Sequence, residues 1–280
     1  MSQSSSSESG TRHALSLAHL SLIACPPDQF ATLAVEAGFG LMDLRLSPAT
    51  PTDRVYGDDE RMGLCRDLLP LLRWTGLKVW DVEIIRLGQH TRPEDHLPMM
   101  EAANLLGAQR IKAVCDCEDR SLSAALLARL AELAASFRLT VDLEYMVFSG
   151  VKSLGAALAI VEAAGQPNLQ VLVDALHWMR AGDTLADIRA APAGRIGYAQ
   201  LCDGPALAPS GREALIMEAR TNRLPPGEGE FPLRALLGAM PPGCPVSIEV
   251  PLPPGEDPLR HARRLLAAAR NVIERQEAVP

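Results

Sequence analysis

Eight short apolar runs recur along the chain, and longer segments with helical spacing separate them. The runs are ALSLAHLSLI (14–23), GLMDLRL (40–46), LKVWDVEIIRL (77–87), RIKAVCD (110–116), TVDLEYM (140–146), LQVLVDA (169–175), IGYAQLC (196–202) and PVSIEVP (245–251). Strands that are apolar on both faces and alternate with helices are typical of a parallel sheet covered by helices. Eight such units predict a single-domain α/β fold, the (β/α)₈ TIM barrel, with an open doubly wound sheet as the alternative.

The segments between the runs support this pattern. Leu and Ala recur every three or four residues in 121–137, 153–165 and 257–276, which predicts helices there. The first twelve residues, MSQSSSSESGTR, are Ser-rich and contain no apolar stretch, so they predict a disordered tail rather than a signal peptide. The predicted barrel therefore covers residues 13–280.

Composition narrows the class of partner. The net charge of −7 argues against a nucleic-acid partner, which requires a clustered positive surface. No apolar run approaches the roughly 20 residues that cross a bilayer. The six cysteines are scattered through apolar segments, which favours reduced, buried thiols. We therefore expect a cytoplasmic protein with neither a nucleic-acid nor a membrane partner, and homo-oligomer formation is left open.

Polar residues follow four successive late strands at their carboxyl ends, where TIM barrels place their active sites. They are Glu144, Asp174, Gln200 and Glu249. Any one of them would ordinarily be a helix cap or an ion-pair partner. Their coincidence on four successive strands favours one divalent metal ion, with Mn²⁺ or Mg²⁺ suiting the oxygen donors best and Co²⁺ or Zn²⁺ as alternatives.

The chemistry expected of such a site is proton transfer. A divalent ion that binds a carbonyl and the neighbouring hydroxyl makes the carbon between them more acidic. Glu144 and Glu249 could then remove and return the proton from opposite sides of a bound molecule that carries these two groups. Isomerisation, epimerisation and dehydration all remain open, because they differ only in where the proton returns or which group leaves.

Further side chains are candidates for substrate binding. In VLVDALHWMR (171–180), His177 and Arg180 follow Asp174 at steps of three and could line the same pocket. His19 and Glu83 are weaker candidates, since His19 could be a core residue and Glu83 could pair with Arg45 or Arg86.

The segments DLEYM, VDALHW, YAQLCD and SIEVP resemble the xylose-isomerase-like TIM-barrel superfamily of sugar and sugar phosphate isomerases and epimerases. The resemblance covers essentially the whole folded chain. It implies that Glu144, Asp174, Gln200 and Glu249 bind one divalent ion. It also implies a small polyhydroxylated substrate, with His177 in contact with a substrate oxygen. The two Glu residues would then flank the carbon that exchanges a proton.

Two positions depart from the family pattern. Gln200 stands where most members have His, which shifts the metal preference away from zinc. Gln at this position also resembles the dehydroshikimate dehydratases of the superfamily. Those lyases, however, carry His two residues after the first Glu, where this chain has Met146. A metal-dependent lyase, similar to a dehydroshikimate or inosose dehydratase, is the alternative function.

One connection is unusually long. Residues 203–232 lie between the seventh run and its helix, and a loop of this length is usually functional or disordered. Its charged middle and its Pro/Gly end predict an ordered flap. The part 218–233 resembles a loop of a poorly characterised bacterial branch of the superfamily. Arg220 and Arg223 within it could bind a substrate carboxylate or phosphate, or could be solvated loop residues.

Two rival classes are disfavoured. An apurinic endonuclease of this superfamily needs several metal ions, many histidines and a basic face, whereas this acidic chain has six histidines. A metal-free binding protein is disfavoured because idle carboxylates close together repel one another.

Overall fold

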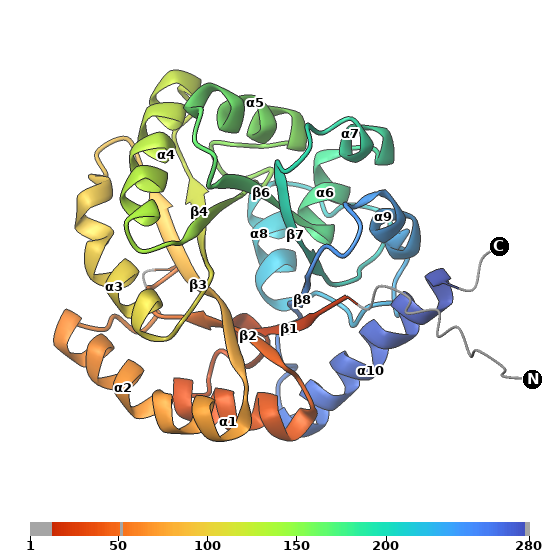
Figure 1. Ribbon diagram of the computed structural model, residues 1–280. Coiled ribbons are helices and arrows are strands. Elements are labelled where there is room, and N and C mark those ends of the chain that lie inside the picture. The colour runs from red at the N-terminus through yellow and green to blue at the C-terminus, as the bar shows by residue number, and fades with distance from the viewer. Residues whose placement is uncertain (1–12, 51–52, 278–280) are drawn as a thin grey trace, which may run out of the picture.

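Each of the eight apolar runs forms one strand of a closed parallel barrel in the computed structural model, which describes residues 13–50 and 53–277 (Figure 1). The strands are β1 (Leu15–Ala18), β2 (Leu41–Arg45), β3 (Lys78–Leu87), β4 (Arg110–Cys115), β5 (Thr140–Glu144), β6 (Leu169–Asp174), β7 (Ile196–Leu201) and β8 (Val246–Ile248). Each strand pairs in parallel with the next, and β8 closes the barrel on β1. The predicted single-domain (β/α)₈ fold is confirmed.

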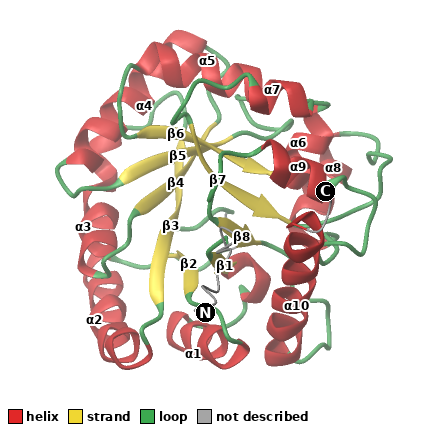
Figure 2. Cartoon of the chain, turned by 45° about the vertical axis from the view of Figure 1, so that its right-hand side comes forward, coloured by secondary structure: helices red, strands yellow, loops and turns green. Residues whose placement is uncertain are grey.

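The helices form a ring outside the strands (Figure 2). They are α1 (Pro27–Ala37), α2 (Asp58–Thr75), α3 (Leu97–Leu105), α4 (Arg120–Ala135), α5 (Leu154–Ala164), α6 (Ala175–Ala181), α7 (Leu185–Arg189), α8 (Arg212–Thr221), α9 (Leu233–Ala239) and α10 (Pro258–Glu277). Two 3₁₀ turns, η1 (His19–Leu22) and η2 (Pro93–His96), complete the elements. The three helices expected from Leu and Ala spacing correspond to α4, α5 and α10.

The structure differs from the predicted strands mainly at the first run. There the strand ends at Ala18, and His19 begins the turn η1. The predicted tail, residues 1–12, lies outside the described residues. All six cysteines are free and buried, as expected. No helix in the described part of the chain is both long and apolar enough to span a membrane.

The long connection 203–232 is ordered, as expected, and contains α8. Asp203 organises it by accepting hydrogen bonds from the backbone N–H groups of Gly204, Gly227 and Phe231 at 2.8–2.9 Å. The chain passes so close to Asp203 at Gly229 that a Cβ there would lie 2.4 Å from the Asp203 Oδ1 atom. Only glycine fits this approach. The loop is therefore a built part of the fold, and its end is fixed above the barrel.

A buried ion pair fastens the same loop to the barrel. Arg180, in α6, donates to both carboxylate oxygens of Glu218, in α8, at 2.8 and 2.6 Å. The side chains of Arg180 and Glu218 are only 1% and 7% exposed. Arg180 also donates to the carbonyl oxygens of Pro205 and Ala206 and lies over the ring of Phe231. One arginine thus joins three parts of the loop to α6.

Polar side chains also lie inside the barrel, and Asp43 in β2 is an example. The hydroxyls of Ser16 in β1 and Ser247, which pairs with Ser16 from β8, both donate to its carboxyl group. Burial raises the pKa of Asp43 from 3.8 to about 7, although nearby Lys112 opposes the shift. The folded protein therefore holds a proton that the unfolded chain releases in weak acid.

We expect Arg180→Ala to lower the free energy of unfolding by about 3 kcal/mol, because Glu218 would remain as a buried charge without a partner. Urea unfolding measures this change. Arg54→Ala is the matched control, since its ion pair with Glu60 is exposed, and we expect it to cost at most about 1 kcal/mol. Equal losses in the two variants would contradict the anchoring role of Arg180.

We expect Asp43→Asn to flatten the dependence of stability on pH between about 4 and 7. The stability that the raised pKa of Asp43 contributes is complete below about pH 4 and is lost as the pH rises to about 7, with a slope of at most ~1.4 kcal/mol per pH unit. Urea unfolding at several pH values tests this. The exposed Asp28→Asn variant should keep the wild-type slope. An unchanged slope in Asp43→Asn would contradict the protonated state of Asp43 in the folded protein.

Candidate active site

A cavity of about 260 Å³ opens at the carboxyl ends of the strands. Glu144, His177 and Glu249 line it, together with five cationic side chains, Arg45, Arg86, Lys112, Arg220 and Arg223. A larger hollow of about 680 Å³ lies at the opposite end of the barrel, beside α10, and none of the strand-end carboxylates lines it. The smaller cavity is therefore the candidate active site, because TIM barrels build their sites at the carboxyl end.

The four polar residues expected at the strand ends all lie at the carboxyl end of the barrel. Glu144 and Asp174 are the last residues of β5 and β6, Gln200 lies in β7 next to the end, and Glu249 follows β8 directly. Asp174 and Gln200 are neighbours in the register of β6 and β7. All four side chains are buried. Successive parallel strands therefore bring three carboxylates and one amide to the carboxyl end of the barrel, where Glu144 and Glu249 line the cavity and Asp174 and Gln200 do not.

Asp174 serves as a helix cap and as an ion-pair partner at once. Its Oδ1 atom accepts from the backbone N–H groups of Leu176 and His177, at 2.8 and 3.1 Å, and so caps α6. Its Oδ2 atom lies 2.6 Å from the Arg223 Nη1 atom. Burial would raise the pKa of Asp174, but the Arg223 guanidinium and His177 together outweigh burial and hold the pKa below its usual value. Asp174 is therefore a fixed anion.

Arg223 bridges two of the strand-end carboxylates. Its Nη2 atom lies 3.0 Å from the Glu249 Oε2 atom, while Nη1 contacts Asp174. Its Nε–H donates to the carbonyl of Ala219 at 2.7 Å, and its side chain is 2% exposed. The long loop thus inserts a guanidinium between β6 and β8.

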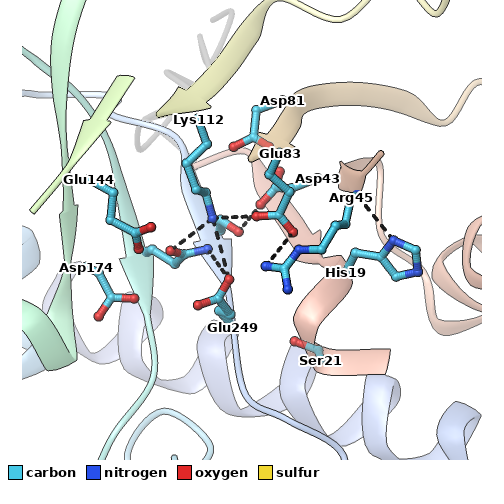
Figure 3. Close-up of polar contacts among 12 residues, drawn as sticks. His19, Ser21, Asp43, Arg45, Asp81, Glu83, Lys112, Glu144, Asp174 and Glu249 are labelled. Carbon is cyan, nitrogen blue, oxygen red and sulfur yellow. Dashed lines mark hydrogen bonds and ion pairs between the residues drawn. The ribbon is translucent and has the colours of Figure 1, made fainter. Parts of the chain in front are cut away.

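Lys112, from the middle of β4, is the second cation on the cavity floor. Its Nζ atom lies 2.7 Å from the Glu83 Oε2 atom, 3.4 Å from Gln200 Oε1 and 3.5 Å from Glu249 Oε1. Figure 3 shows its ammonium group between Glu83 and Glu249, with Arg45 beyond Glu83. Arg45 pairs with Glu83 at 3.3 Å. Burial would raise the pKa of Glu83, but Lys112 and Arg45 lower it to about 2.

Glu144 has the least compensated carboxylate of the site. Within the described residues, no Lys or Arg lies at ion-pair distance from it, and its nearest partner is the His177 Nε2 atom at 4.0 Å. Burial raises the pKa of Glu144 to about 7, with Lys112 opposing the shift. Burial also lowers the pKa of His177 to about 4, so the imidazole is neutral at pH 7.

Other predicted site residues lie farther from this centre. His19 is buried in η1, where one ring nitrogen contacts the carbonyl of Cys25 and the other accepts from the Arg45 N–H. Arg180 is held by Glu218, and neither it nor His19 lines the cavity. Arg220 is exposed at the cavity rim. The substrate-binding roles of these residues remain predictions.

Lys112 and Arg45 are site residues that the sequence analysis missed. The signal for Lys112 was present, because a lysine in the centre of the apolar run RIKAVCD is almost never fully buried unless it is paired. What the sequence could not supply was its partners, which come from β3, β7 and the residue after β8.

A metal ion was expected here, and the donors fit one only in part. Glu144, Asp174 and His177 each offer an atom within 4.8 Å of the others, so this buried cluster could hold an ion. The four-ligand set fits less well, because Asp174 and Glu249 contact Arg223, and Gln200 accepts from Lys112 while donating to Glu249 at 3.1 Å. As they lie, these groups face two cations. The predicted ligand set and the identity of the ion remain untested.

Known structures share this fold. The IolI protein with a bound zinc atom has a TM-score of 0.76 at 16% identity, covering 94% of this chain and 99% of that one. The probable 3-DHS dehydratase AsbF from Bacillus anthracis has a TM-score of 0.70 at 15% identity, covering 92% and 98%. A D-allulose 3-epimerase from Methylomonas sp. has a TM-score of 0.67 at 16% identity, covering 93% and 98%. No curated protein matches the sequence.

The family comparison is more specific than these structural likenesses. The model of the xylose isomerase-like TIM barrel matches residues 31–269, which include all of the strand-end residues described above. With the closed barrel and the carboxylates at its carboxyl end, this match shows that the chain belongs to the xylose isomerase-like TIM barrel family.

Proposed function

We propose that the protein is an isomerase or epimerase that transfers a proton next to the carbonyl group of a sugar, a sugar phosphate or a related keto-polyol. The observation that carries this proposal is the floor of the 260 Å³ cavity, where two buried carboxylates face the same space as two buried cations. Such a cavity suits a small polyhydroxylated molecule, because polar groups converge on it from several strands.

Glu144 is the better placed base. It lines the cavity, and no ion pair with Lys or Arg engages it, so its carboxylate is available to a C–H group of the substrate. When Glu144 takes that proton, the electron pair moves onto the carbonyl oxygen and forms an enediolate. Positive groups already fixed in a buried site stabilise such a charge without reorganising.

Glu249 lies on the other side of the floor, after β8, where Lys112 and Arg223 orient it. It is the candidate for the second acid–base group. In aldose–ketose isomerisation, Glu144 returns its proton to the neighbouring carbon while a proton passes between the two substrate oxygens. In epimerisation, a Glu249 that enters the step protonated gives its proton to the opposite face of the same carbon, and Glu144 keeps the proton that it removed. Every group in this scheme belongs to the chain itself.

The rim provides the groups that would hold the rest of the substrate. His177 lines the cavity as a neutral imidazole, which can donate to or accept from a hydroxyl. Arg220 is exposed at the rim and suits a carboxylate or phosphate on the substrate. If a hydroxyl lay β to the carbanion, it would leave as water, and the same site would act as the lyase considered above.

Deuterium exchange tests this proposal. Ketoses, aldoses, sugar phosphates, sugar acids and cyclic polyol ketones would be incubated with the protein in D₂O, and each would be examined by NMR and mass spectrometry. We expect deuterium next to the carbonyl of at least one substrate, and a rate lower by about 10²–10⁴-fold in Glu144→Gln, because that variant lacks the base.

Glu162→Gln is the control, since Glu162 lies in α5 and pairs with Arg195 on the surface, and it should keep the wild-type rate. An isomeric product supports an isomerase or epimerase, whereas loss of water from the substrate supports the lyase. Exchange that persists at the wild-type rate in Glu144→Gln would contradict the role of Glu144. Failure of the whole panel to exchange would contradict the proposed function.

A further inference from the structure

The positive charge in this site comes from the chain. Lys112 and Arg223 lie where carboxylates from β3, β6 and β8 converge, and both side chains are at most 2% exposed. Arg223 occupies the space between Asp174 and Glu249, which are two of the four groups expected to share one ion. A guanidinium between two carboxylates neutralises them as an ion would, but its position is fixed by the fold.

The charges of the cluster nearly balance. Its carboxylates are Glu83, Glu144, Asp174 and Glu249, and its cations are Arg45, Lys112 and Arg223. A divalent ion added here would meet two buried positive groups that cannot move into water. Metal sites built from carboxylates normally present negative charge that the ion itself compensates.

Both cations are held by more than the carboxylates. The Arg223 Nε–H donates to the carbonyl of Ala219, and its Nη1 also contacts the Cys202 Sγ atom at 3.4 Å. Lys112 belongs to a central strand and also donates to Gln200. Neither side chain can turn away without leaving a buried hydrogen-bonding group unpaired, which would be costly. The two cations are therefore built parts of the site.

We propose that Lys112 and Arg223 replace the divalent ion as the groups that stabilise the enediolate, and that the protein works without a resident metal. The catalytic half of this inference rests on the proposed function. Both residues line the cavity, so a substrate oxygen can reach them. When Glu144 removes the proton, the electron pair shifts onto the carbonyl oxygen, and the nearby ammonium and guanidinium charges stabilise that oxygen electrostatically.

Metal binding tests, without any substrate, whether Lys112 and Arg223 take the place of a divalent ion. Wild-type protein would be incubated separately with Mn²⁺, Mg²⁺, Co²⁺ and Zn²⁺, desalted, and analysed by elemental mass spectrometry, with the melting temperature measured in each ion. We expect less than about a tenth of an equivalent of bound ion, because Lys112 and Arg223 already neutralise the carboxylates. We also expect no shift in melting temperature, because an ion that the folded protein does not bind cannot stabilise it.

The variant Arg223→Met should show the opposite result. It frees Asp174 and Glu249 beside Glu144, so we expect it to bind about one equivalent of ion and to melt at a higher temperature when the ion is added. Arg110→Met is the matched control, because Arg110 pairs with buried Asp142 at 2.8 Å at the start of β4 and does not line the cavity. It should gain no ion.

One equivalent of metal in the wild type, lost in Asp174→Asn, would overturn the proposal. The wild-type measurement decides this even if Arg223→Met does not fold. If the variant folds and takes up no more ion than Arg110→Met, the idea that Arg223 occupies the ion's place is also wrong.

The catalytic half is read from the exchange assay. With a substrate found in D₂O, we expect EDTA to leave the rate unchanged and Lys112→Met to lower kcat by about 10²-fold or more. Loss of exchange in EDTA, restored by a metal ion, would overturn the proposal while leaving the proposed function intact. If no substrate exchanges, the proposed function fails, but the metal measurements still decide whether the chain's own cations hold the ion's place.

Discussion

A buried carboxylate must find a positive partner or keep its proton, and this constraint governs the interior of the barrel. Both solutions occur within a short distance of one another. Asp43 takes the second, since burial raises its pKa to about 7 and the hydrogen bonds from two serine hydroxyls offset only part of that shift. Glu83 takes the first, since Lys112 and Arg45 hold it ionised. The desolvation cost of each charge explains why the partners are so closely fitted.

Much of the fold could be predicted from the sequence because it depends on local pattern. Apolar runs and helical spacing are properties of neighbouring residues, and they located every strand and the helices α4, α5 and α10. The family match over residues 31–269 agrees with the resemblance noted from the motifs. The positions of Glu144 and Asp174 at strand ends followed as well, because parallel strands present their carboxyl ends on one face.

The electrostatics of the site could not be predicted in this way. The partners of Lys112 come from three other places in the chain, and the guanidinium of Arg223 reaches the floor only because its loop folds over the barrel. Reasoning from the strand ends alone counted three carboxylates without their cations. Because of that omission, a metal-free protein was expected to be destabilised by repulsion between idle carboxylates. The lysine and arginine side chains among the carboxylates remove this repulsion.

The origin of Arg223 has a consequence for how sites of this kind can diverge. Lys112 belongs to a barrel strand, but Arg223 is carried by the connection between β7 and α9, which Asp203 and the Arg180–Glu218 pair hold in place. Loops tolerate insertion and deletion far better than strands do. The net charge of the catalytic floor is therefore encoded in an exchangeable segment. A relative with a shorter connection would keep the same barrel and carboxylates yet leave Asp174 and Glu249 open to an ion, so a change in loop length can alter cofactor dependence without altering the core.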